Sequence, residues 1–183
     1  FGDKYVDKRG YKIVANLPYN IATFLIRNWL EMKNPPKQMV LMIQKEVAQR
    51  ISARPPRLNL LGAAVQFYAK PKIIGYLKPA DFWPKPKVAS AIIKIVPHKY
   101  GSAAFAGDRK QMLSNDAKKS FFKLLKAGFS QPRKQLMGNL TRKLKIPREE
   151  FVSIFKDLNI SERSRAENLG VGDWLNLAKT LRP

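Results

Sequence analysis

Short apolar segments alternate with helical patterns along the first half of the chain, and this alternation limits the possible folds more than any other feature. Four apolar runs are typical of buried strands, at residues 11–15, 38–43, 73–77 and 89–96. Three stretches between them have helical spacing, at residues 21–32, 44–52 and 58–68. The first of these helices carries one apolar stripe, formed by Ile21, Phe24, Leu25 and Trp29. The alternation predicts an α/β domain with a mostly parallel, buried sheet.

The pattern changes after His98. Residues 99–115 have no clear periodicity and are expected to form a linker. Beyond them only helical patterns occur, at residues 116–128, 132–144, 147–158 and 171–181. Ser114, Asn115 and Asp116 are candidate N-caps for the first of these helices, and Gly128 is a candidate stop. We therefore expect two parts, an α/β part at residues 1–98 and a helical part at residues 99–183.

The predicted sheet looks incomplete at its start. A doubly wound α/β domain usually begins with a strand and a glycine-rich turn that receives a cofactor. No such turn occurs here, because Gly2 and Gly10 are isolated. We expect that a segment carrying the cofactor motif precedes residue 1.

The charge of the chain indicates a polyanionic partner. It carries 35 Lys and Arg against 13 Asp and Glu, a net charge of +22, with 17 of the basic residues at positions 1–98 and 18 at positions 99–183. A folded domain this basic most often binds nucleic acid. The alternative is a ribosome-rich environment or an acidic partner, without direct contact to phosphate.

Other classes of site and location are disfavoured. The chain has no cysteine, which excludes disulfides and thiolate chemistry, and its single histidine, His98, is expected at the surface. We expect no metal site. No apolar run is long enough to span a membrane and no signal peptide is visible, so a cytoplasmic location is expected, with an organelle matrix as the alternative.

The segment Asn16, Leu17, Pro18 and Tyr19 is the strongest candidate for a catalytic site, because it follows the first predicted strand. In an open α/β sheet, ligands bind at the carboxyl ends of strands. Pro18 stiffens the backbone, so the carbonyl of Leu17 and the side chain of Asn16 can act as two hydrogen-bond acceptors. Tyr19 adds an aromatic face.

These groups suit a reaction at the exocyclic amine of adenine. Two acceptors that hold its N–H groups would direct the nitrogen lone pair toward an incoming methyl group, while an aromatic ring stacks on the flipped base. No strong base is needed, since the proton can leave once the nitrogen is cationic. Alone, such a tetrapeptide is more often a turn that ends a strand.

Five motifs, in order, resemble those of the KsgA-type ribosomal RNA adenine dimethyltransferases. They are VANLPYNI at residues 14–21, VLMIQKEVAQR at 40–50, FWPKPKVASA at 82–91, FSQPRKQL at 129–136 and RAENL at 165–169. Together they span nearly the whole chain. The resemblance implies the C-terminal part of a Rossmann-like, S-adenosylmethionine-dependent methyltransferase domain, followed by a small all-α domain.

The resemblance also implies an activity. It is the N6,N6-dimethylation of two adjacent adenosines near the 3′ end of small-subunit (16S) ribosomal RNA, on a 30S precursor particle, by a monomer. It assigns Asn16, Leu17, Pro18 and Tyr19 to the target base, with Asn16 also near the cofactor. Phe82 is expected to cover the other face of the base, although it could be a core residue. The glycine motif for the cofactor is missing, so the chain alone should be inactive and bind S-adenosylmethionine poorly.

Basic residues in both parts are candidate RNA contacts, namely Arg54, Arg57, Arg133, Lys134, Arg142, Lys143 and Lys145. The alternative for each is an ordinary solvated surface. Where the family has paired arginines, this chain has Pro132 before Arg133, and Pro132 is expected to begin a helix.

Three other functions stay open. The first is a large-subunit ribosomal RNA adenine dimethylase of the macrolide-resistance type, whose C-terminal region lacks the later motifs. The second is a non-catalytic nucleic-acid-binding relative such as a mitochondrial transcription factor, which the intact Asn16, Pro18 and Tyr19 argue against. The third is a DNA adenine methyltransferase, which Leu17 disfavours because proline is usual there.

Overall fold

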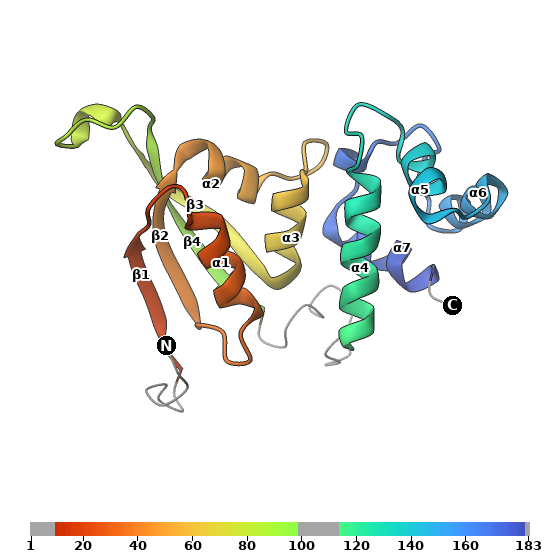
Figure 1. Cartoon of the computed structure of the whole chain (residues 1–183), viewed down its shortest axis with the longest axis horizontal. Coiled ribbons are helices and arrows are strands. Elements are labelled where there is room, and N and C mark those ends of the chain that lie inside the picture. The colour runs from red at the N-terminus through yellow and green to blue at the C-terminus, as the bar shows by residue number, and fades with distance from the viewer. Residues whose placement is uncertain (1–9, 99–113, 182–183) are drawn as a thin grey trace. The chain divides into compact units, whose positions relative to one another are not determined.

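The computed structural model describes residues 10–98 and 114–181 (Figure 1). The chain divides into two compact units, one drawn from Phe1–Ser52 and Tyr68–Lys99, the other from Ala53–Phe67 and Tyr100–Pro183. Residues 53–67 thus cluster with the later helices, although they belong to the α/β part in the sequence. The expected boundary at residue 98, between the α/β part and the helical part, stays a prediction. The expected linker at 99–115 falls mostly outside the described residues.

The first unit is built on four strands. They are β1 (Lys12–Asn16), β2 (Gln38–Gln44), β3 (Ala69–Leu77) and β4 (Ser90–Pro97). Helix α1 (Ala22–Glu31) connects β1 to β2, and α2 (Lys45–Ser52) follows β2 directly. A short 3₁₀ helix, η2 (Pro79–Asp81), lies in the loop between β3 and β4.

The sheet is mixed, with the strand order β1-β2-β4-β3. β1 pairs with β2 in parallel, whereas β4 pairs with both β2 and β3 in antiparallel orientation. The prediction of a mostly parallel sheet is therefore wrong for the strand pairs. Three strands run in one direction, but β3 returns through a hairpin-like loop into β4, which inserts between β2 and β3 and reverses both pairings.

Burial along the strands explains this order. The inward residues of β2 and β4 are almost completely buried, with Leu41 and Ile93 as examples, so these two strands occupy the centre of the sheet. β3 alternates between half-buried and exposed residues and forms an edge, which accounts for Pro71 within a strand. Because an edge strand tolerates proline, β3 begins at Ala69 rather than at residue 73 as expected.

The apolar stripe expected on α1 is only partly the buried one. The residues of α1 that are fully buried are Ala22, Ile26 and Leu30. Phe24 is 62% exposed and Ile21 39%, and Val14 on the neighbouring strand β1 is 80% exposed. Helix α1 is apolar on more than one side, and its sequence therefore does not determine which side faces the sheet. His98 also differs from expectation: it is only 7% exposed, and its backbone N–H donates to the Tyr68 carbonyl at 2.9 Å.

The second unit consists of helices. They are α3 (Leu60–Tyr68), α4 (Asn115–Gly128), α5 (Leu136–Leu144), α6 (Arg148–Asp157), the 3₁₀ helix η3 (Ala166–Asn168) and α7 (Val171–Thr180). Of the three candidate N-caps, Ser114 caps α4, because its side chain accepts a hydrogen bond from the Ala117 N–H at 3.2 Å. The expected helix start at Pro132 is wrong. Residues 131–134 form a turn, closed by a hydrogen bond from the Lys134 N–H to the Gln131 carbonyl. Helix α5 therefore begins at Leu136, four residues after Pro132.

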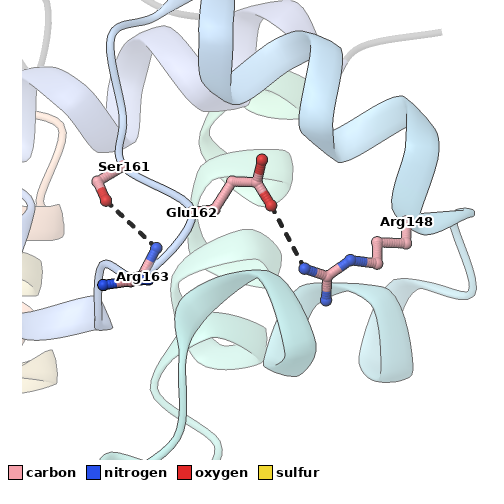
Figure 2. Close-up of polar contacts among 4 residues, drawn as sticks. All are labelled: Arg148, Ser161, Glu162 and Arg163. Atoms are coloured by element: carbon pink, nitrogen blue, oxygen red, sulfur yellow. Dashed lines mark hydrogen bonds and ion pairs between the residues drawn. The ribbon is translucent and has the colours of Figure 1, made fainter.

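Aromatic packing and surface ion pairs hold this unit together. Phe67 of α3 stacks on Phe121 of α4 with ring centroids 4.3 Å apart, and Phe129 stacks on Trp174 of α7 at 5.6 Å. Figure 2 shows two polar contacts of the connection that follows α6. Glu162 in this connection pairs with Arg148, the first residue of α6, at 3.3 Å, and the Arg163 N–H donates to the Ser161 hydroxyl. The ion pair is half exposed, so it contributes at most about 1 kcal/mol. Among the described residues, no helix is long and apolar enough to cross a membrane.

Gly128, at the end of α4, tests the packing of the second unit. A Cβ at this position would overlap the ring of Trp174, whereas a Cβ on Gly172 would meet no atom within 4 Å. We expect Gly128→Ala to lower the free energy of unfolding by about 1–3 kcal/mol through overpacking. Gly172→Ala is the control and should cause no loss. Urea unfolding followed by circular dichroism measures both, and equal midpoints would contradict the close packing of α4 against α7.

Candidate active site

One edge of the sheet collects the candidate catalytic segments. β1, β2 and β3 run in the same direction, so their carboxyl ends meet at one edge, where β4 begins (Figure 1). The segment after β1 and the loop between β3 and β4 both lie at this edge. In open α/β sheets this is the edge that binds ligands.

The backbone of the segment after β1 is held firmly on one side. Asn16 is in register with Met42 of β2, and the Leu17 N–H donates to the Met42 carbonyl at 3.1 Å, which extends the ladder by one residue. The Leu17 side chain is buried. The Pro18 carbonyl accepts from the Ile21 N–H at 3.2 Å, which turns the chain into α1.

The ring of Tyr19 is fixed by its hydroxyl group. Tyr19 Oη and Ser90 Oγ lie 2.8 Å apart in a hydrogen bond, and Ser90 is completely buried at the first position of β4. Because β4 lies between β2 and β3, this bond ties the segment after β1 to the centre of the sheet. The orientation of the aromatic face is therefore determined by a residue 71 positions away.

A cavity of about 400 Å³ opens at this edge. Its lining consists of Asn16, Leu17, Pro18, Tyr19, Met42, Phe82, Trp83, Pro84 and Pro86. The structure thus brings all five predicted catalytic residues around one space. Phe82 is half-buried and Trp83, beside it, is 96% exposed. The lining includes three aromatic side chains and no lysine, arginine, histidine, aspartate or glutamate.

Two of the lining residues, Asn16 and Leu17, each carry a hydrogen-bond acceptor. Neither the Leu17 carbonyl nor the Asn16 side chain is hydrogen-bonded to another residue in the described parts of the chain. A planar ring with an amino group can therefore be stacked and held by its N–H groups. No lining residue is a strong general base.

The predicted RNA contacts lie in the second unit. Lys134 and Arg142 line one hollow, although one is in the turn before α5 and the other in its last turn. Arg133 and Lys143 are exposed beside them in the sequence, and Lys145 ends α5 with a positive φ of 58°. Arg54 and Arg57 are exposed in the turn before α3, closed by a hydrogen bond from the Arg57 N–H to the Arg54 carbonyl at 2.8 Å.

Sequence reasoning did not identify the residues that support these sites. Met42 and Ser90 both lie within the family motifs, but nothing in the pattern showed that Ser90 would bond to Tyr19. The one signal in the sequence is a serine at the start of a mostly apolar strand, because a polar side chain buried there needs a hydrogen-bond partner. Asn139, which is buried in α5 beside Arg142, gave no signal because a polar residue in a helix is usually exposed.

Comparison with known proteins assigns the chain to a family. The family model described as ribosomal RNA adenine dimethylase matches residues 2–182. The chain belongs to this ribosomal RNA adenine dimethylase family. The ribosomal RNA small subunit methyltransferase A of Dehalococcoides mccartyi (strain CBDB1) is 36% identical over 167 residues, which are 91% of this chain and 54% of that protein.

Two solved structures share the fold. A dimethyladenosine transferase from Plasmodium falciparum has a TM-score of 0.72 and 25% identity, covering 95% of this chain and 67% of that one. The 23S rRNA methyltransferase ErmE has a TM-score of 0.71 and 17% identity, covering 97% and 68%. These neighbours confirm the predicted α/β methyltransferase fold with helices. The chain spans about half the length of the curated relatives it matches.

The hydrogen bond between Tyr19 and Ser90 can be tested by a double-mutant cycle. Tyr19→Phe should lower the free energy of unfolding by about 1–3 kcal/mol, because it leaves the buried Ser90 hydroxyl without a partner. Ser90→Ala should have a similar effect. The double variant should be more stable than the sum of the two losses predicts, with a coupling of about 1 kcal/mol. Additive losses in urea unfolding would show that the two hydroxyls do not interact.

Proposed function

We propose that the protein transfers methyl groups from S-adenosylmethionine to the N6 atoms of two adjacent adenosines near the 3′ end of small-subunit ribosomal RNA, and that each adenosine is methylated twice. The observation that supports this most directly is the cavity at the carboxyl edge of the sheet. It joins two unpaired acceptors to aromatic side chains. The name carried by the matched curated relatives favours the small-subunit substrate.

The acceptors of the cavity would bind the amine of a flipped adenine. The Asn16 side-chain oxygen and the Leu17 carbonyl each accept one N–H, which draws the nitrogen out of conjugation with the ring. Tyr19 stacks on one face of the base and Phe82 covers the other. The hydrogen bond to Ser90 keeps the Tyr19 ring in place while the base enters.

The uncharged lining suits a reaction in which no base acts before the transfer. S-adenosylmethionine supplies the methyl group when it is bound. The amine becomes cationic as it accepts that group, and the two acceptor oxygens stabilise the positive charge by charge-assisted hydrogen bonds. The proton then passes to water. In a second round the amine has a single N–H left, so one acceptor is sufficient.

The described residues fit the methyl donor only in part. Asn16 is the one lining residue with a flexible polar side chain, and this side chain would hold the donor beside the base. No carboxylate in the lining could hold ribose hydroxyls, and no glycine there could admit a phosphate or carboxylate closely. Most of the donor site is therefore assigned to residues outside this cavity.

The remaining parts of the proposal concern partners and location. The substrate is proposed to be a precursor of the 30S particle, bound by a monomer in the cytoplasm. The bacterial relatives carry names that refer to the small ribosomal subunit, which supports this choice. Dimethylation of large-subunit RNA is the second candidate, but the likeness to ErmE concerns the fold alone.

Asn16 and Asn20 form a matched pair for testing the catalytic role. Both asparagines are exposed, Asn16 at the end of β1 and Asn20 in the turn before α1, but only Asn16 lines the cavity. In the full-length protein, Asn16→Ala should lower methyl transfer to small-subunit particles by about 100-fold or more, as loss of one preorganised polar contact does. RNA binding should be unchanged, and Asn20→Ala should stay within about twofold of the unaltered protein. Transfer retained by Asn16→Ala would exclude the role.

The basic turn before α5 tests the RNA contact. Replacing Arg133 and Lys134 with alanine should weaken binding to a small-subunit RNA fragment and flatten the salt dependence by about 0.7–0.9 for each phosphate that is no longer neutralised. A matched control replaces Lys123 and Lys156 with alanine, since both lysines are also exposed in the same unit. Affinities at several salt concentrations, measured by fluorescence anisotropy, separate the two variants. Equal effects would show that only net charge matters.

A further inference from the structure

A second hollow, of about 310 Å³, lies in the helical unit, and all of its lining residues except one glycine have polar or charged side chains. The residues around it are Gln131, Lys134, Gln135, Gly138, Asn139 and Arg142. Gly138 leaves the space open, because a Cβ built on it would meet no atom within 4 Å. Unlike the cavity at the sheet edge, the lining contains no aromatic ring that could stack on a base.

Asn139 gives the hollow a fixed structure. It is 1% exposed, and its amide nitrogen donates to the carbonyls of Gly128 at 2.7 Å and Gln131 at 3.0 Å. Both N–H groups are thus used to hold the turn before α5 against the helix. The amide oxygen is left to accept from Arg142 Nη2 at 3.4 Å. The guanidinium is therefore oriented by a side chain that cannot itself turn.

The positive charge at the hollow has no acidic partner. In the described parts of the chain, no carboxylate pairs with Lys134 or Arg142, whereas Arg148 in the same unit pairs with Glu162 (Figure 2). The N–H groups of Met137 and Gly138, in the first turn of α5, likewise have no acceptor there. Two cations that line one hollow, one of them directly before the N-terminus of α5, make a site for an anion.

We propose that this hollow binds one backbone phosphate of the RNA, with Lys134 and Arg142 as ligands and the first turn of α5 as a further donor. The proposal rests on the RNA substrate proposed above and adds the place where one phosphate is held. The net charge of +22 favours a nucleic acid over an acidic peptide as the source of the anion. The absence of an aromatic ring from the lining favours the backbone over a base.

Gly138→Glu is the decisive variant. Glutamate is favoured in the first turn of a helix, so the fold should be retained, but its carboxylate would compete with the phosphate for Lys134 and Arg142. Gly172→Glu is the matched control, because it adds the same charge in the first turn of α7, again where a Cβ meets no atom. We expect Gly138→Glu to lower RNA affinity by at least about tenfold more than Gly172→Glu does.

Arg142→Gln tests the same site by removing a cation. It should lower RNA affinity and reduce the slope of log affinity against log salt by about 1, as expected for a phosphate contact. Lys156→Gln removes one charge from the exposed face of α6 and should change affinity much less. If both variants of the hollow behave as their controls while the unaltered chain binds RNA, this inference fails and the proposed function stands. If the unaltered chain binds no RNA, both fail.

Nuclear magnetic resonance identifies the source of the anion. An RNA oligonucleotide should shift the amide signals of Met137 and Gly138 at concentrations at least about tenfold lower than inorganic phosphate requires, because neighbouring phosphates add to the binding. Equal concentrations would overturn the proposal in favour of a site for free phosphate. Shifts produced by an acidic peptide at lower concentrations than by RNA would overturn it in favour of a protein partner.

Discussion

The insertion of β4 between β2 and β3 is the constraint on which the candidate site depends. Because β4 runs against its neighbours, its first residue, Ser90, lies at the edge where β1, β2 and β3 end. The same reversal requires a loop at that edge, and this loop carries Phe82 and Trp83. A fully parallel sheet would have sent the chain back across the sheet at this point. The aromatic loop would then have had no reason to lie beside Tyr19.

Several features of this arrangement could be predicted from sequence, since they depend on local chemistry. Short-range patterns place the first strand to within one residue, narrow the cap of α4 to three candidates and predict the helical character of the second half. What failed depends on tertiary contacts. Proline at 132 is compatible with a first helical turn, yet Asn139 draws the carbonyl of Gln131 into a separate turn, and α5 begins later. His98 is buried because the end of β4 pairs beside Tyr68, which no local pattern reveals.

The candidate residues show the same division. All five predicted catalytic residues surround one cavity, because four are contiguous and the fifth belongs to a loop stiffened by Pro84 and Pro86. The basic residues could be recognised as a class, but charge alone does not show which of them converge. Lys134 and Arg142 meet because a buried asparagine ties the turn to α5. A sequence pattern finds the cations, whereas only the fold selects a pair.

The two sites differ in a way that fits the chemistry of a modified base. The cavity at the sheet edge has no ionised side chain in its lining, so contacts made there are little affected by dissolved salt. The hollow in the helical unit depends on cations, and binding there must weaken as salt rises. Under the proposed function, a basic side chain beside the base would repel the ammonium that forms during transfer and would attract phosphates into the cavity. An acidic side chain would instead attract the ammonium. Under the proposed function, separation of the charged contacts from the uncharged ones would let the RNA backbone bind strongly while the amine is held only by neutral oxygens.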